Sequence, residues 1–276
     1  LLLFSKKLMF KSFFQSTKLA TVLVTGFILF QLLNIDYGTE INNLAHVKEF
    51  MVNPNVSIGS GLERDNIAGY GAGESLHRWM TRFKLYSIEA DEHINIMALS
   101  RIKPEEGKFD PHFYQYGGAW LYPLGVWYFI LSKTNIITLG PLDLYLQSPD
   151  LIDAIYIWGR IFVLITVAIS AIFLFFACRQ FASNTESLLC LALFLCAPMT
   201  IMFSQVMKPH WYALLWVCIC LSILARCTAQ GFWRFRDTLG VGVCIGLAVG
   251  SVITFGLFAL VLWLAMFFFS NKGLIS

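Results

Sequence analysis

Charged side chains are scarce in this 276-residue chain: Asp, Glu, Lys and Arg make up 13% of it, whereas 57% of its residues are apolar. Soluble domains carry about 25% charged residues, so this scarcity argues against a soluble enzyme and against a disordered chain. Net charge is also nearly absent, because 20 basic side chains balance 17 acidic ones. A nucleic-acid partner, which would require a basic surface, is therefore not expected.

Cysteine is missing from the most polar part of the chain. Residues 36–114 hold 20 of the charged side chains and four of the five histidines, but no cysteine. This excludes a disulfide framework or a cysteine-ligated zinc site in that region. We interpret the seven cysteines, which lie in or beside apolar stretches, as small buried apolar side chains. They are Cys178, Cys190, Cys196, Cys218, Cys220, Cys227 and Cys244.

Several long stretches contain no charged residue at all. Each has at least the roughly 17 residues with which a helix crosses the hydrocarbon core of a bilayer. They cover residues 19–35, 161–178, 187–207, 209–225 and 238–271. The sequence therefore predicts an all-α integral membrane protein, a multi-span helical bundle whose large extracytoplasmic first loop carries amphipathic helices.

The first apolar stretch follows a lysine-rich segment, as a signal peptide would. It is longer than the apolar part of a signal peptide and no small-x-small cleavage site follows it, so we expect a retained span. The predicted organisation begins with a cytoplasmic N-terminus (1–18) and a first transmembrane helix (19–35). An extracytoplasmic loop with interfacial helices and the active site follows (36–153). The rest is a transmembrane bundle (154–276), with spans at about 154–178, 187–206, 210–225 and 238–269. Because the chain begins with Leu and ends just after an apolar run, we expect it to be truncated at its C-terminus.

The basic residues predict the orientation, since Lys and Arg accumulate in short cytoplasmic connections. With these spans, nearly all of them outside the large loop fall on one side: Lys6, Lys7, Lys11, Lys18, Arg179, Arg226, Arg234 and Arg236. On the other side only Lys208 lies in a short connection. We therefore expect a multi-pass protein of the bacterial plasma (inner) membrane, with the large loop on the extracytoplasmic side.

Two uncharged segments leave the number of spans open. Residues 116–131 are nearly long enough to cross, but Gly and Pro interrupt them and Trp and Tyr are frequent, which favours an interfacial or re-entrant segment. Residues 238–270 are long for one span and short for two. Within the large loop, residues 53–73 predict irregular chain, and residues 75–86 predict an amphipathic helix that packs either on the membrane surface or on its own loop.

The segment around Asp91 and Glu92 carries the candidate chemistry. A helix is expected to begin at Asp91, ahead of apolar residues at helical spacing. Asp91 either caps this helix, with Glu92 favoured by the helix dipole, or acts as a general base at the membrane surface. About 55 residues separate Ile35 from Asp91, a long interval, so Asp36 is a rival for the base.

The order of motifs resembles the GT-C superfamily of membrane glycosyltransferases, in particular family 39, which contains protein O-mannosyltransferases and aminoarabinose transferases. The motifs are Asp-Glu at 91–92, FDPHFYQYGG at 109–118 with Tyr-Pro at 122–123, and YIWGR at 156–160. The resemblance covers about residues 86–225. It implies an enzyme that moves a sugar from a polyprenyl-phosphate donor to a hydroxyl of a glycan, lipid or protein acceptor.

The resemblance also implies roles for individual residues. Asp91 would be the catalytic base, Glu92 its neighbour, and Arg160 a cation at the outer end of the second span. Lys208 and His210 fall in a short external connection, where His210 replaces an Asp found in many relatives. Cations at these places would stabilise the leaving phosphate, and direct attack by the hydroxyl would invert the anomeric carbon without a second carboxylate as acid.

Other interpretations of these residues stay open. Arg160 and Lys208 could extend to the membrane interface as basic side chains commonly do at span ends. Contact with the sugar is expected from His93, Tyr114 and Tyr116, although Tyr114, Tyr116 and Tyr122 could equally form an interfacial aromatic belt. No cofactor is expected, and a divalent metal held by members of the set Asp91, Glu92, His93, Asp110 and His112 is a weaker alternative.

Two other functions compete with the enzyme. A transporter or flippase of a lipid-linked or small polar substrate would place polar residues near the middle of broken helices, whereas here the charges lie at span ends. A scaffold subunit would use the large loop to bind a partner.

Overall fold

A computed structural model of the chain describes residues 2–37, 39, 85, 87, 89–141, 144–145, 148 and 150–261. Over these residues it contains α-helices, two short 3-10 helices and one isolated β-bridge, but no strand. The predicted all-α class is thus confirmed for this part of the chain. The irregular segment expected at 53–73 and, apart from Leu85, the amphipathic helix expected at 75–86 lie outside the described residues.

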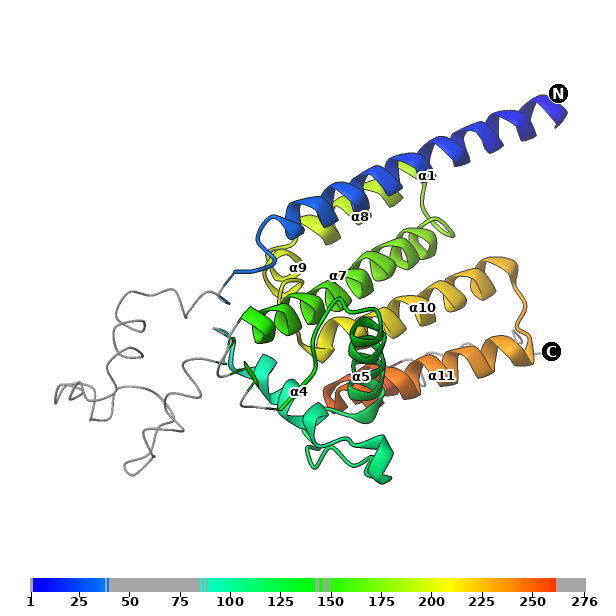
Figure 1. Cartoon of the computed structure of the whole chain (residues 1–276). Coiled ribbons are helices and arrows are strands. Elements are labelled where there is room, and N and C mark those ends of the chain that lie inside the picture. Colours follow the sequence, from blue (N-terminus) through cyan, green and yellow to red (C-terminus); the bar gives the residue numbers. More distant parts are fainter. Residues whose placement is uncertain are drawn as a thin grey trace.

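Five helices run roughly side by side (Figure 1). They are α1 (Leu2–Leu32), α7 (Asp150–Cys178), α8 (Asn184–Cys196), α10 (Pro209–Gln230) and α11 (Phe235–Ser251). Helix α10 packs between α7 and α11, and α8 packs against both α7 and α1. The short helix α9 (Pro198–Phe203) follows α8.

The shorter elements gather around one end of these helices. Helix α4 (Ala90–Ser100) leads through the 3-10 helix η2 (Pro104–Glu106) to α5 (Gly118–Lys133), and α11 is followed by the 3-10 helix η3 (Ile253–Phe255). Helix α5 contacts α7, α10 and α11 and crosses their direction in Figure 1. Residues 116–131, for which an interfacial or re-entrant segment is expected, thus largely form one helix.

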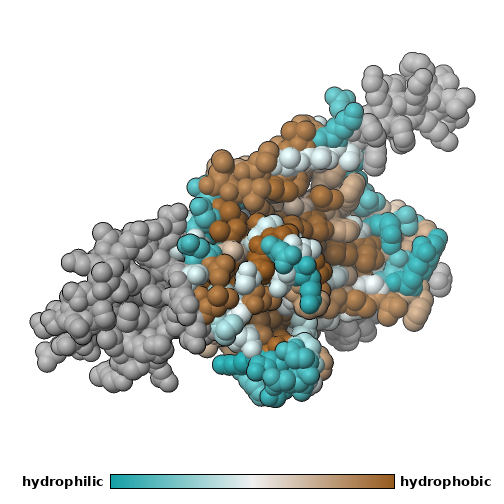
Figure 2. All heavy atoms as spheres, viewed as in Figure 1, coloured by the Kyte–Doolittle hydropathy of each residue, from teal (hydrophilic) through white to brown (hydrophobic). Residues whose placement is uncertain are grey.

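Two described helices, α7 and α10, are long and apolar enough to cross a membrane, and α8 is apolar but shorter. This supports membrane association. The sphere view agrees with it, because hydrophobic residues cover the middle of the visible face and hydrophilic residues gather toward its right-hand end and on the loop below (Figure 2).

The helix boundaries differ in part from the predicted spans. The stretch 187–206 forms two helices instead of one, because the chain is extended at Ala197 and Pro198 starts α9. Pro is favoured at a first helical position, where its missing N–H leaves no bond unmade. Helix α11 ends at Ser251, where Val252 takes an extended conformation, so the stretch expected at 238–269 is also interrupted.

The directions of the helices separate two ends of the bundle. Helices α7 and α10 finish at the same end, where α11 begins, whereas α4 and the start of α10 lie at the opposite end (Figure 1). The end where α10 finishes and α11 begins, called here the basic end, contains Arg226, Arg234 and Arg236. The opposite end, which contains Asp91 and Lys208, is called the acidic end. The expected grouping of the arginines on one side agrees with these directions.

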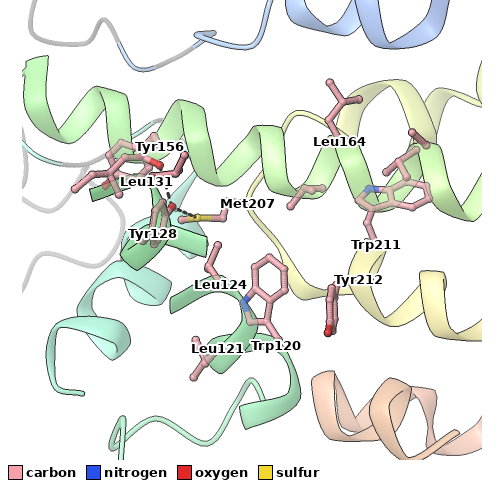
Figure 3. Packing of buried hydrophobic residues seen from close by; sticks show 14 of the residues in the cluster. Trp120, Leu121, Leu124, Tyr128, Leu131, Tyr156, Leu164, Met207, Trp211 and Tyr212 are labelled. Atoms are coloured by element: carbon pink, nitrogen blue, oxygen red, sulfur yellow. Dashed lines mark hydrogen bonds between the residues drawn. The ribbon is translucent and has the colours of Figure 1, made fainter. Parts of the chain in front are cut away.

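The core that supports the acidic end is aromatic and aliphatic (Figure 3). Trp120, Leu121 and Leu124 of α5 are fully buried and belong to the same cluster as Tyr156 of α7 and Met207, which precedes α10. Helix α5 is thereby fixed against α7 and the chain that precedes α10.

A glycine contact joins α5 to the end of α11. The backbone N–H of Gly117 donates to the carbonyl of Ser251 at 3.0 Å. A Cβ at Gly117 would lie only 1.7 Å from the carbonyl oxygen of Gly250. No larger residue fits here without a shift of the backbone, so glycine is required for this close approach.

Candidate functional site

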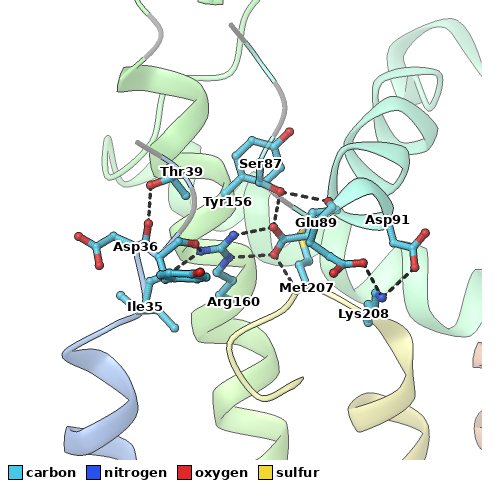
Figure 4. A network of polar contacts seen from close by, with 12 residues as sticks. Ile35, Asp36, Thr39, Ser87, Glu89, Asp91, Tyr156, Arg160, Met207 and Lys208 are labelled. Atoms are coloured by element: carbon cyan, nitrogen blue, oxygen red, sulfur yellow. Dashed lines mark hydrogen bonds and ion pairs between the residues drawn. The ribbon is translucent and has the colours of Figure 1, made fainter. Parts of the chain in front are cut away.

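Asp91 and Glu92 lie in the first turn of helix α4, as expected. The N-cap of this helix is Glu89, whose side chain makes no capping bond, so the interpretation of Asp91 as the cap is wrong. Carboxylates in a first turn are still favoured by the helix dipole. The two side chains nevertheless lead to different surroundings, as Figure 4 shows for the polar contacts at this end of the bundle.

Glu92 forms a buried ion pair with Arg160 of α7. Arg160 Nε donates to Glu92 Oε1 at 2.8 Å and Nη2 donates to Oε2 at 2.6 Å. The Glu92 side chain is 0% exposed and that of Arg160 2%. Two parallel bonds of this kind are the strongest and most directional form of an arginine–carboxylate pair.

Most of the pair's remaining hydrogen-bonding capacity is also used. Glu92 accepts further bonds from the Ser87 hydroxyl and, at 2.8 Å, from the Met207 N–H. Arg160 Nη1 donates to the carbonyls of Ile35 and Tyr37 at 2.9 and 2.7 Å. A buried ion pair is tolerated when its remaining groups are satisfied in this way. The pair therefore connects the end of α1, α4, α7 and the chain before α10.

Asp91 instead takes part in a partly exposed cluster with Lys208, the N-cap residue of α10. Lys208 Nζ lies 3.0 Å from Asp91 Oδ2 and 2.6 Å from Glu89 Oε1. The side chains of Asp91 and Glu89 are each 33% exposed and that of Lys208 16%. Burial by itself lowers the pKa of Lys208, but its bonds to Glu89 and Asp91 outweigh this effect and raise it, so the ammonium stays charged.

Tyr116 completes the surroundings of Asp91. Its hydroxyl donates to Asp91 Oδ2 at 3.1 Å, and burial together with the nearby Asp91 charge raises the pKa of Tyr116 to about 12. The phenol therefore remains a donor at physiological pH. Its ring meets the ring of His210 edge to face, with centroids 6.4 Å apart. Glu89, Asp91, Tyr116, Lys208 and His210 are called here the Asp91 cluster.

Asn95 sets the distance between α4 and the start of α10. Its Nδ2 donates to the carbonyls of Asp91 and Met207, at 2.9 and 3.0 Å. Its Oδ1 accepts a bond from the indole N–H of Trp120 at 2.8 Å. Since Asn95 is fully buried, these bonds fix Met207, and with it the adjacent Lys208, relative to the first turn of α4.

A second buried amide cluster holds the end of α1 in place. Gln31 Nε2 donates to the Ser204 hydroxyl at 2.7 Å and to the Ile201 carbonyl at 3.0 Å. Gln31 Oε1 accepts a bond from Gln205 Nε2 at 2.7 Å. Because buried amides are costly unless bonded, this cluster specifies how α1 sits against the end of α9, and so where the Ile35 carbonyl meets Arg160.

Other predicted site residues lie outside the Asp91 cluster. Tyr114 is exposed and donates to Asp110 Oδ2 at 2.8 Å, and Tyr122 donates to the Phe109 carbonyl at 3.2 Å. His93 is half-buried in the first turn of α4. Asp36 is exposed and lies on the other side of the Arg160–Glu92 pair from Asp91 (Figure 4).

A divalent metal receives no support from the geometry. Within the described residues, no three His, Cys, Asp or Glu side chains are arranged to hold a metal ion. The suggested ligands are engaged elsewhere: Glu92 is buried against Arg160, and Asp110 accepts bonds from the His112 N–H and the Tyr114 hydroxyl.

Sequence reasoning missed Glu89 and Asn95. A signal for Glu89 was present, since acidic residues at 89, 91 and 92 form a dense group. A signal for Asn95 was present as well, because it is a polar residue between Ile94 and Ile96, in the mainly apolar part of α4 that follows the first turn. Each of them has one partner more than 100 positions further along the chain, Lys208 for Glu89 and the Met207 carbonyl for Asn95.

Comparison of the chain with family models, curated proteins and solved structures finds no match. Within the described residues, the feature with the most direct chemical meaning is the Asp91 cluster, a carboxylate and an ammonium that are both in reach of solvent at one end of two potential membrane-spanning helices.

Proposed function

We propose that this protein is a multi-span membrane glycosyltransferase that moves a sugar from a polyprenyl-phosphate donor to an acceptor hydroxyl on the extracytoplasmic face. The observation that carries this proposal is the partly exposed Asp91 carboxylate next to the Lys208 ammonium, at the acidic end of α7 and α10. A base for the acceptor and a cation for the leaving phosphate are the two groups that this transfer needs.

In the proposed reaction, the acceptor oxygen attacks the anomeric carbon and its proton passes to Asp91. The bond between the anomeric carbon and the phosphate oxygen breaks, and its electron pair leaves with the phosphate. Lys208 stabilises the charge that the phosphate gains, and His210 contributes a hydrogen bond. Attack opposite to the leaving group inverts the anomeric carbon, and a phosphate can leave without a carboxylic acid to protonate it.

Tyr116 has a positioning role in this mechanism. Its pKa of about 12 keeps its hydroxyl protonated, so it donates to one oxygen of Asp91. Lys208 contacts that same oxygen. Asp91 Oδ1 thus stays available for the acceptor hydroxyl.

Glu92 and Arg160 also have positioning roles. Glu92 accepts four hydrogen bonds and is out of reach of solvent, so it is not a second base. All three guanidinium nitrogens of Arg160 donate to protein groups. The proposed contacts to the leaving phosphate therefore come from Lys208 and His210. The Glu92–Arg160 ion pair holds α4 against α7 and thereby fixes the position of Asp91 in the first turn of α4.

The test has two steps. Mass spectrometry of lipid that copurifies with the protein identifies the bound carrier and its sugar. That donor is then offered to the purified chain in lipid nanodiscs with a hydroxyl acceptor, and its conversion to free polyprenyl phosphate is followed. We expect Asp91→Asn to slow conversion by about 10²- to 10⁴-fold, as is typical when a general base is removed.

Glu106→Gln is the matched control. Glu106 is an exposed carboxylate paired with two lysines, at 2.6 Å from Lys108 and 3.2 Å from Lys103, so its substitution also removes a lysine-paired carboxylate, but outside the cluster. Its loss should leave conversion unchanged. Full conversion by Asp91→Asn would refute the mechanism, and movement of intact donor between leaflets without cleavage would favour a flippase.

A further inference from the structure

A cavity of about 320 Å³ lies at the basic end of the bundle, where α10 ends and α11 begins. It is far from the Asp91 cluster, because α10 spans 22 residues between the two, about 33 Å at 1.5 Å per residue. Its lining consists of Arg226, Gln230, Phe232, Arg234, Arg236 and Asp237. The proposed glycosyl transfer uses none of these residues.

The lining of this cavity is strongly basic. Three guanidinium groups face one carboxylate, so its formal charge is +2. Asp237 is buried, and both of its carboxylate oxygens accept hydrogen bonds. The donors are Arg226 Nη2 at 2.7 Å and the backbone N–H of Arg234 at 3.1 Å. Asp237 therefore orients Arg226 without cancelling the charge of the other two arginines, both of which are exposed.

The connection that carries these arginines has a defined shape. Gly231 ends α10 in the left-handed conformation, with φ 71°, and its N–H donates to the Cys227 carbonyl at 3.0 Å. The Arg234 guanidinium lies 5.1 Å from the centre of the Phe232 ring, within range of a cation–π contact. The cavity is thus built before any ligand arrives, which reduces the ordering cost of binding.

Exposed apolar side chains lie among the residues that line the cavity and next to them in the sequence. Phe232, Phe235 and Leu239 are 44%, 84% and 58% exposed, and they lie on the same turn and on the first residues of α11. Helix α10, which leads into the cavity, is long and apolar enough to cross a membrane. A basic cavity with exposed apolar side chains near it, at the end of such a helix, matches a lipid, with its headgroup in the cavity and its acyl chains along the helices.

We propose that this cavity binds the phosphate of an anionic phospholipid. Guanidinium groups suit this ligand because their planar N–H donors can form two parallel bonds to phosphate oxygens. A soluble phosphate would use the same donors but would gain nothing from the exposed Phe235 and Leu239. The lipid anchors the basic end of α10 and α11 at the membrane surface, independently of the chemistry at the acidic end.

The test uses the full chain in nanodiscs that contain equal parts of phosphatidylcholine and phosphatidylglycerol. Native mass spectrometry after release into detergent counts the lipids that stay bound. The chain should retain phosphatidylglycerol selectively, and Arg234→Gln/Arg236→Gln should lower this retention by about tenfold or more. Retention of phosphatidylcholine should not change.

Two further variants make the result specific. Lys103→Gln/Lys108→Gln removes the same formal charge from the exposed loop near the acidic end and should leave retention unchanged. Arg234→Lys/Arg236→Lys keeps the charge but loses the planar donors, and should give intermediate retention. Equal retention by the glutamine variant and the original chain would overturn the proposal, as would an equal loss in the Lys103/Lys108 variant.

Inorganic phosphate separates the two sources of the ligand. Added in excess during release, it should displace little phosphatidylglycerol if the acyl chains contribute to binding. Complete displacement would show that the cavity is a site for soluble phosphate and would refute the assignment to a lipid.

Discussion

Asp91 and Glu92 are neighbours in the first turn of α4, and each pairs with a cation from a distant part of the chain, yet the two pairs differ in burial. Glu92 and Arg160 are 0% and 2% exposed, whereas Asp91 and Lys208 are 33% and 16% exposed. Successive residues of a helix point about 100° apart, so one carboxylate faces the bundle and the other its edge. A carboxylate paired with a cation thus joins helices in one case and stays accessible to solvent in the other.

The two ion pairs also differ in their contribution to the stability of the fold. A buried pair gives up the hydration of both charges, and it repays this cost only while each partner keeps the other. A partly exposed pair in a more polar environment contributes little to stability. We therefore expect substitutions at the Glu92–Arg160 pair to affect folding and substitutions at the Asp91–Lys208 pair to affect chemistry.

The largest effect on stability should follow from breaking the buried pair. Glu92→Met leaves the Arg160 charge buried without its partner and should cost about 3 to 5 kcal/mol, with a similar loss for Arg160→Met. Thermal unfolding in detergent, followed by tryptophan fluorescence, measures both. The double variant should lose clearly less than the sum of the single losses. Additive losses would show that the pair does not act as a unit.

Gly117→Ala should have the next largest effect. The new Cβ would lie 1.7 Å from the Gly250 carbonyl oxygen, so the chain has to shift and Tyr116 moves with it. Overpacking of this kind costs about 1 to 3 kcal/mol. Under the proposed function, the variant should also convert the donor more slowly, because Tyr116 would no longer orient Asp91. Gly242→Ala is a suitable control, since a Cβ there meets nothing within 4 Å. Equal unfolding temperatures for the two variants would contradict the close approach.

Asp91→Asn should change stability only slightly, by about 1 kcal/mol or less, because its ion pair is partly exposed. Lys208 keeps Glu89 as a second partner at 2.6 Å, which further limits the loss. The same unfolding assay checks this, with Glu92→Met measured beside it. A loss as large as that of Glu92→Met would mean that the two pairs are equivalent, and the comparison between them would fail.

The smallest effect is a pH dependence that comes from Tyr116. Its pKa of about 12 in the folded protein lies above the ordinary tyrosine value of 10.0, so the folded state holds the phenolic proton more tightly than the unfolded state. The resulting stabilisation is fully present below about pH 10 and is lost as the pH rises toward about 12. Tyr116→Phe should flatten this decline in unfolding temperature. Tyr114→Phe serves as the control and should alter the slope less, because Tyr114 is 79% exposed and solvent weakens the effect of the Asp110 bond that raises its pKa. Equal slopes for Tyr116→Phe and the original chain would rule out this role.

Much of the fold could be predicted from patterns along the chain. Uncharged stretches predicted helices that the structure contains as α7 and α10, and Asp91 marked the start of α4. The interruptions were harder to predict, because Pro198 can either kink a helix or start a new one, and its surroundings decide between the two. The start of helix α5 also depends on tertiary contacts, since glycine is required at position 117 only because the backbone of Gly250 comes so close.

The candidate site, like the fold, could be predicted only in part from the sequence. The sequence by itself determined that acidic residues open α4 and that Arg160 and Lys208 are among the few cations near the expected extracytoplasmic face. Only the tertiary structure decided that Glu92 takes Arg160 while Asp91 and Glu89 take Lys208. The physical reason is that these pairings join residues 68 to more than 100 positions apart, and that burial, which separates a structural carboxylate from an accessible one, depends on every element packed around it.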